Sequence, residues 1–207
     1  MKQEREHRFV PVASALCLLG ILVAVMWWAE ASQFRGPASS TRLPAIGGAF
    51  TLTSTHGTTV TEQSYRGKIQ LVYFGYTYCP DACPTMLNKI ASALDELGPL
   101  AARVQPLFIS IDPQRDTPEV LAQYVESFSS RIVGLTGTPA QIAAAAKAFG
   151  VYYAPYEIAD APDGYLMDHT SAAFVMNVDD YFVATFTPDT PAAQMAARLR
   201  TLIAQSS

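Results

Sequence analysis

Cysteine is scarce in this sequence of 207 residues, which contains only three. A small exported domain stapled by disulfides needs more cysteines, so the sequence does not belong to that class. Two of the three, Cys79 and Cys83, are four positions apart, whereas Cys17 stands alone near the N-terminus. One close pair and one distant cysteine indicate metal or redox chemistry.

Charge is also sparse, and clusters of basic residues are missing. Charged residues make up 15% of the chain, and the net charge is −4. This acidic balance argues against nucleic acid as a partner. Half of the residues are hydrophobic, so the chain can bury a real core and is not a disordered tail. Its length suits one ordinary domain and an appendage, with no internal repeat.

The N-terminal region lacks charge over residues 9–29. At about 1.5 Å per residue this segment would extend roughly 31 Å, enough to cross the hydrocarbon core of a bilayer. Three basic residues precede it: Lys2, Arg5 and Arg8. We therefore predict a transmembrane anchor at 9–29, a cytoplasmic N-terminus at 1–8 and an exported remainder.

A cleaved signal peptide is the alternative interpretation, because Ala29-Glu30-Ala31 forms an A-x-A site. The leader is not the long, Arg- and Ser-rich, acid-poor type that directs proteins to organelles. We therefore expect a bacterial inner-membrane protein with its domain in the periplasm. Residues 30–43 are predicted to be a flexible linker.

Strand-like and helix-like segments alternate after the linker. Residues 49–63 predict a β-hairpin around His56-Gly57, and residues 69–77 predict a buried strand followed by a helix at 85–97. A short polar loop is expected between Tyr156 and Asp168. The remaining segments are strands at 104–111, 131–137, 151–158, 171–178 and 181–186, and helices at 117–128, 138–150 and 190–205. This order predicts an α/β, thioredoxin-like domain over residues 44–207, with an added N-terminal hairpin and an inserted helix.

The cysteine pair lies between the predicted strand 69–77 and the helix that follows it. Ligands bind beyond the carboxyl ends of parallel strands, so this loop should occupy the reactive edge of the sheet. Pro84 suits the first helical turn, where amide groups favour a thiolate and lower the thiol pKa. Two Cα atoms at this spacing can be about 6 Å apart, which permits either a disulfide or a shared metal ion.

His169 precedes the predicted strand 171–178 and should emerge near the same edge. A lone histidine is more often structural than a ligand. Two thiolates and one imidazole would nevertheless make a soft three-ligand site that suits Cu(I) and tolerates Cu(II). Zinc accepts the same ligands. Asp168 would either orient the imidazole or cap a turn.

A second polar stretch, "SIDPQRDTPE", follows the strand at 104–111. Asp112, Arg115 and Asp116 could pair with one another and rigidify this loop. Alternatively, they could line a docking surface beside the metal site. The residue types leave both interpretations open.

Three motifs behind a single predicted membrane span resemble the Sco/SenC family: "GYTYCPDACP", "SIDPQRDTPE" and "YLMDHTSAAF". The family consists of membrane-anchored copper chaperones of cytochrome c oxidase assembly with a thioredoxin fold. The resemblance implies copper ligation by Cys79, Cys83 and His169. It also implies an upstream copper donor and delivery to the binuclear copper centre of oxidase subunit II.

The main alternative is a thiol–disulfide oxidoreductase that reduces the acceptor's cysteines before copper arrives. Cys79 and Cys83 would then be a redox dithiol, and His169 would have no role. A thiol peroxidase would need a peroxide pocket, which no sequence feature indicates. We therefore expect a metallochaperone without a catalytic residue, with dithiol reduction as a possible second activity.

Overall fold

The computed structural model describes residues 20–28, 30, 46–159 and 164–206. The chain divides into two compact units, Met1–Leu43 and Pro44–Ser207. Residues 20–28 of the first unit are helical with exposed side chains. Within the described ranges, no helix has the length and apolar character needed to span a bilayer. The predicted segment 1–8, most of the predicted anchor 9–29 and of the linker 30–43, and Cys17 lie outside the described residues.

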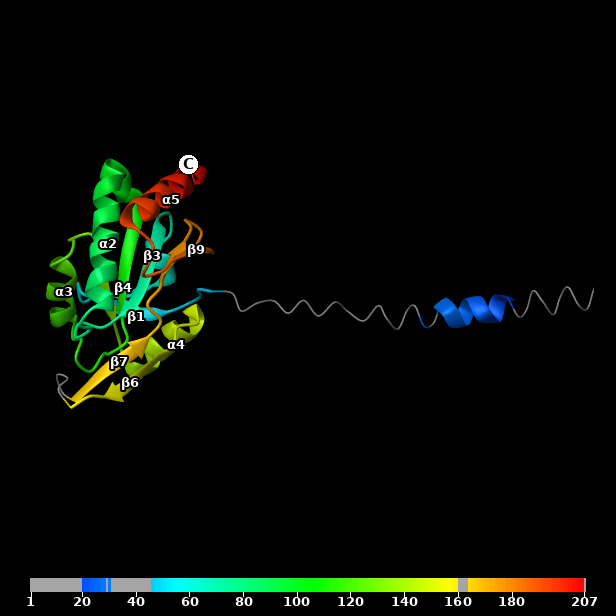
Figure 1. Ribbon diagram of the computed structural model, residues 1–207, viewed down its shortest axis with the longest axis horizontal. Helices are drawn as coiled ribbons and strands as arrows, with labels where there is room; N and C mark the ends of the chain where they lie inside the picture. The colour runs from blue at the N-terminus through cyan, green and yellow to red at the C-terminus, as the bar shows by residue number, and fades with distance from the viewer. Residues whose placement is uncertain (1–19, 29, 31–45, 160–163, 207) are drawn as a thin grey trace, which may run out of the picture. The chain divides into compact units, whose positions relative to one another are not determined.

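A seven-stranded sheet forms the centre of the second unit (Figure 1). Three parallel strands lie in its middle, and antiparallel strands flank them on both sides. The predicted hairpin at 49–63 is confirmed at one edge, and the strands predicted at 171–178 and 181–186 pair with each other at the other edge. In spatial order the strands are β2 (Thr59–Thr61), β1 (Thr51–Ser54), β5 (Val133–Thr136), β4 (Val104–Ser110), β3 (Ile69–Gly75), β8 (Ala173–Met176) and β9 (Phe182–Phe186).

Helices connect the parallel strands and close the domain. They are α2 (Ala82–Leu97), α3 (Pro118–Glu126), α4 (Pro139–Phe149) and α5 (Ala192–Gln205), with 3-10 turns η1 (Glu62–Tyr65) and η2 (Gly98–Arg103). Both α3 and α4 begin with a Thr-Pro pair. The Thr117 hydroxyl accepts a hydrogen bond from the backbone N–H of Val120, and the Thr138 hydroxyl accepts one from that of Gln141. These bonds cap the two helices.

Strand β3 separates the two faces of the core, and all of its residues are buried. Because side chains alternate along a strand, Tyr73 and Phe74 point to opposite faces. The Tyr73 ring meets Phe108 on the face of α2 and α3, whereas the Phe74 ring meets Phe149 of α4. Burial of such side chains contributes about 1.5–3 kcal/mol each to stability. The core therefore fixes the end of β3, from which the cysteine loop departs.

A second sheet, of two strands, lies outside the main one. It consists of β6 (Tyr153–Glu157) and β7 (Tyr165–His169), which pair in antiparallel register and form the lower end of the domain in Figure 1. The structure shortens the expected loop between Tyr156 and Asp168 at both ends, because β6 extends to Glu157 and β7 begins at Tyr165. His169 is the last residue of β7 and lies opposite Tyr153.

Candidate metal centre

The cysteines are positioned by the end of β3 and the start of α2. Cys79 lies in the short connection between them, where its N–H group donates to the carbonyl of Tyr76. Cys83 is the second residue of α2, because the helix begins at Ala82, three residues earlier than the predicted start at Thr85. Cys83 is fully buried, whereas Cys79 is half-buried. The two thiols therefore face different environments, although only three residues separate them.

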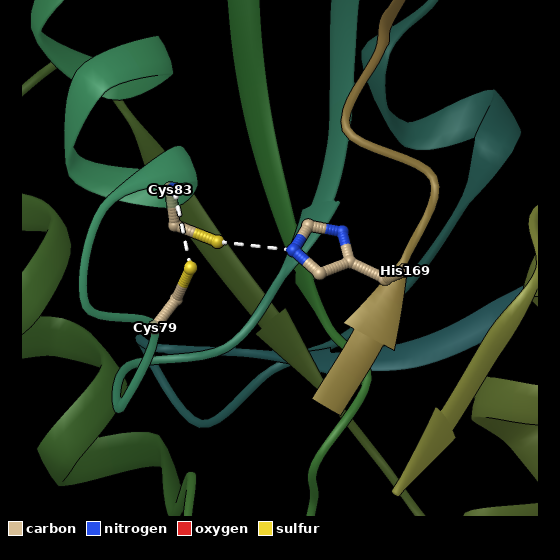
Figure 2. Close-up of side chains that lie close together, drawn as sticks. All are labelled: Cys79, Cys83 and His169. Atoms are coloured by element: carbon tan, nitrogen blue, oxygen red, sulfur yellow. Dashed lines mark hydrogen bonds between the residues drawn. The ribbon is translucent and has the colours of Figure 1, made fainter. Parts of the chain in front are cut away.

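His169 approaches the two sulfur atoms from β7, and the three side chains point toward one another (Figure 2). Its Nε2 atom lies 3.5 Å from the sulfur of Cys83. The backbone N–H of Cys83 donates to the sulfur of Cys79 over 3.4 Å. One ligand atom from each residue lies within 4.8 Å of the others, and both cysteines are free thiols.

The imidazole of His169 is oriented by its surroundings. Its Nδ1 atom lies 3.1 Å from the carbonyl oxygen of Thr170, which can only accept a hydrogen bond. The proton therefore belongs on Nδ1, and Nε2 presents a lone pair to the sulfur atoms. The ring also makes edge contacts with Tyr76 and Tyr73, at centroid distances of 5.9 and 6.3 Å. These contacts hold the ring plane toward the cysteines.

The pKa values of the two thiols are shifted in opposite directions. A hydrogen bond from the Cys83 side chain is the largest cause that lowers the pKa of Cys79 to about 4, and burial opposes it. Burial is the largest cause that raises the pKa of Cys83 well above its ordinary value, and the neighbouring Cys79 adds to it. The apo site therefore holds one thiolate, on Cys79, and one thiol, on Cys83.

Two residues of β3 surround the Cys83 sulfur, and the sequence pattern assigns neither of them a role in the site. The buried hydroxyl of Tyr73 donates to the Cys83 sulfur over 3.7 Å, within the range for sulfur acceptors. Gly75 leaves room for that sulfur, because a Cβ atom at this position would lie 2.6 Å from it. Tyr73 lies within the apolar run of β3, and Gly75 ends β3 as the first residue of "GYTYCPDACP".

The residues of the stretch "SIDPQRDTPE" lie beside the cysteine loop. Several of their side chains bond to one another. Arg115 Nε donates to Asp112 Oδ2 over 2.5 Å, and both side chains are almost completely buried. Asp116 is fully buried and accepts hydrogen bonds from Ser110 Oγ and from the N–H and hydroxyl of Thr77. The carboxylate of Asp116 thereby ties the loop after β4 to the segment that carries Cys79.

Asp168 is separated from these contacts. Its side chain is exposed, and its backbone pairs with Ala154 across the β6–β7 ribbon. Because successive residues of a strand point to opposite faces, Asp168 and His169 project to different sides of β7. The Nδ1 partner of the imidazole is the Thr170 carbonyl and not the Asp168 carboxylate.

The three ligand atoms fit a single soft metal ion. Metal–sulfur bonds of about 2.3 Å place the ligands of one ion roughly 3.5–4.6 Å apart, close to the separations seen here. Thiolates favour Cu(I), and an imidazole adds tolerance for Cu(II). A disulfide would remove both sulfur ligands, so the metal would need the free thiols found here.

Comparison with known proteins agrees with this geometry. The SCO1/SenC family model matches residues 38–204. The chain is 40% identical to the human mitochondrial SCO1 homolog over 160 residues, covering 76% of this chain and 53% of that protein. It is 46% identical to SenC of Rhodobacter capsulatus over 132 residues, covering 64% of this chain and 59% of SenC. The chain thus spans little more than half the length of these relatives.

Solved structures show the same fold. The copper-bound structure of ScoI from Bradyrhizobium japonicum superposes with a TM-score of 0.71 at 41% identity, covering 76% of this chain and 99% of that one. Copper-bound yeast Sco1 gives a TM-score of 0.71 at 34% identity, covering 78% of this chain and 90% of that one. The family model, at residues 38–204, spans nearly all of the described domain. The chain therefore belongs to the SCO1/SenC family, with that family's thioredoxin-like fold.

Proposed function

We propose that this protein binds copper through Cys79, Cys83 and His169 and delivers it to the binuclear copper centre of cytochrome c oxidase subunit II. Membership of the SCO1/SenC family supports the link to oxidase assembly. Two related structures with copper bound support the choice of metal. An upstream copper donor would have to load the site.

The observation that carries the proposal is the convergence of two sulfur atoms and one imidazole nitrogen within 4.8 Å. A dithiol reductase needs only the cysteines, whereas a copper site gains a third ligand from His169. The half-buried Cys79 leaves the ion open on one side, so the ligands of an acceptor can replace those of the donor. A fully enclosed site would bind copper but release it slowly.

We also propose that the protein is a single-pass protein of the bacterial inner membrane, with residues 44–207 in the periplasm. The charge-free segment 9–29 and the basic residues before it support this placement. Confinement beside a membrane-bound acceptor would raise the effective concentration of the chaperone. Separating the membrane and soluble fractions of cells that express the full chain would test this part.

The variant His169→Ala tests the role of the imidazole. We expect it to abolish stable Cu(II) binding and oxidase maturation, while Cu(I) still binds to the dithiolate and the thiols stay reactive. Copper content, absorption of the sulfur-to-copper bands and oxidase activity in a strain lacking the wild-type protein would measure this. His56→Ala is the matched control, because His56 lies in the β1–β2 turn. Full oxidase assembly with His169→Ala would contradict the proposal.

A second candidate function is reduction of the acceptor's cysteines. The observation that favours it is the pair of free thiols with opposite acidities, which suits a nucleophilic thiolate and a resolving thiol. Incubation of the reduced protein with an oxidised subunit II fragment, without copper, tests it. Transfer of two electrons per chain would establish the activity, and unchanged thiol counts on both proteins would exclude it.

A further inference from the structure

The β6–β7 ribbon that carries His169 is joined to the domain by side-chain packing, including that of buried Met167, and not by pairing with the main sheet. Its two strands pair with each other and not with the seven-stranded sheet. A cavity of about 300 Å³ lies behind the ribbon, bounded by residues that include Ile111, Ile142, Tyr153 and Met167. The chain rejoins the main sheet only at Ala173, after His169. Sheet hydrogen bonds therefore do not set the distance from the imidazole to the cysteines.

Arg115 fastens this ribbon to the loop after β4. Its Nη1 atom donates to the backbone carbonyl of Tyr165 over 3.1 Å, and its guanidinium carbon lies 3.7 Å from the centroid of the Tyr165 ring. Asp112 completes the contact, because it accepts hydrogen bonds from both Arg115 and the Tyr165 hydroxyl. Tyr165 is the first residue of the strand that ends at His169.

The same guanidinium also contacts the cysteine segment. It lies 4.7 Å from the ring centroid of Tyr78, the residue before Cys79, and 5.8 Å from that of Tyr76. A cation over an aromatic face within about 6 Å is attracted to it, most strongly where water is excluded. The Arg115 side chain is only 7% exposed. One buried cation thus joins the segment of the thiolates to the strand of the imidazole.

We propose that Arg115 is a positioning residue that holds His169 within bonding range of the two sulfur atoms. It would thereby decide whether an ion has three ligands or only the two thiolates. This inference rests on the proposed copper function for its consequence, but its geometric claim concerns the metal-free protein. Since thiolates alone suit Cu(I), whereas Cu(II) benefits from nitrogen, loss of Arg115 should weaken Cu(II) binding selectively.

The test compares three full-length variants. Arg115→Met removes the charge and the planar donor group but keeps an unbranched chain. Because it leaves the Asp112 carboxylate buried without its cation, the double variant Arg115→Met/Asp112→Asn removes both charges and so guards against simple misfolding. Arg131→Met is the control, because Arg131 is half exposed and pairs with Asp95 on the surface.

The first measurement is made on reduced, copper-free protein by NMR. We expect ring-proton contacts between His169 and Tyr76 in the wild type and the control, and their loss in both Arg115 variants. Contacts between Phe74 and Phe149, on the other face of β3, should stay in all proteins. Retention of the His169–Tyr76 contacts in the double variant would overturn the proposal. Loss of the Phe74–Phe149 contacts as well would also overturn it, since Arg115 would then support the whole fold.

The second measurement is copper binding by the same proteins. We expect Cu(II) affinity to fall about 10- to 100-fold in the Arg115 variants, with weaker nitrogen coupling in the electron paramagnetic resonance spectrum and unchanged Cu(I) stoichiometry. Equal losses for Cu(I) and Cu(II) would overturn the selective role. If the wild type bound no copper while the NMR contacts behaved as expected, the proposed function would fail and the positioning of His169 by Arg115 would stand.

Discussion

The Nε2 atom of His169 lies 3.5 Å from the sulfur of Cys83, although 86 positions separate the two residues in the chain. Three elements produce this approach: β3 ends at Gly75, α2 encloses Cys83 in its first turn, and β7 ends at the histidine. None of these elements depends on a bound metal for its hydrogen bonds. The copper-free protein should therefore already hold its ligands close together.

The acidity of the two thiols predicts selective alkylation. Because the pKa of Cys79 is lowered to about 4 and that of Cys83 is raised, iodoacetamide should modify Cys79 alone. The rate should change little between pH 6 and pH 8, since Cys79 is already a thiolate throughout that range. Mass spectrometry of peptides from reduced protein would measure it. A rate that rises tenfold per pH unit across this range would show an ordinary thiol.

The same acidity predicts how stability depends on pH. The folded protein loses the Cys79 proton near pH 4, whereas an unfolded cysteine keeps it until pH is near 8.5. The unfolded state therefore binds more protons in this window, so stability attributable to Cys79 increases with pH and is lost on acidification. Urea unfolding of reduced protein and of Cys79→Ser, at pH 5 and pH 8, should show a larger difference at pH 8. An equal difference would contradict the prediction.

Tyr73→Phe should change the electronic properties of the site. The hydroxyl donates to the Cys83 sulfur and withdraws electron density from it. Its removal makes the thiolate a stronger donor, which stabilises Cu(II) relative to Cu(I) and lowers the reduction potential of bound copper. A hydrogen bond of about 1 kcal/mol corresponds to roughly 40–50 mV. Redox titration would measure it, with the exposed Tyr181→Phe as control.

Gly75→Ala should disturb Cys83 directly. The added Cβ would lie 2.6 Å from the Cys83 sulfur and 2.7 Å from Phe108 Cε2, so one of them must move. We expect a loss of about 1–3 kcal/mol in unfolding free energy and weaker copper binding. Gly57→Ala is the control, because that site has open space but a positive φ of 74°. It should lower stability through backbone strain and leave copper binding unchanged.

The strands and helices of this domain were largely predictable because local patterns dictate them. The continuous apolar run of β3 predicts a strand buried on both faces, and the Thr-Pro pairs predict the starts of α3 and α4. The strand β7 could not be predicted in the same way. Its five residues combine buried Met167 with exposed Asp168, and among the described residues it pairs only with the short strand β6, across a polar connection.

The ligands of the candidate site were predictable from the sequence, but the residues that hold those ligands in place were not. Cys79 and Cys83 form a motif, and His169 belongs to another, so residue types alone suggest a shared ion. The hydroxyl of Tyr73 has no sequence signal, because a tyrosine in an apolar strand is normally a core residue. The contacts of Arg115 with Tyr78 and Tyr165 join segments far apart in the chain, and only the folded structure brings them together.

The two sulfur atoms differ in burial, so one side of the site is exposed and the other is closed. Cys83 is sealed beneath β3 and α2, whereas Cys79 keeps contact with water. An ion bridging them would be approachable from the side of Cys79 and His169, which are both partly exposed, and not from behind Cys83. The copper donor and the copper acceptor would therefore have to bind the same exposed face of the site, one after the other.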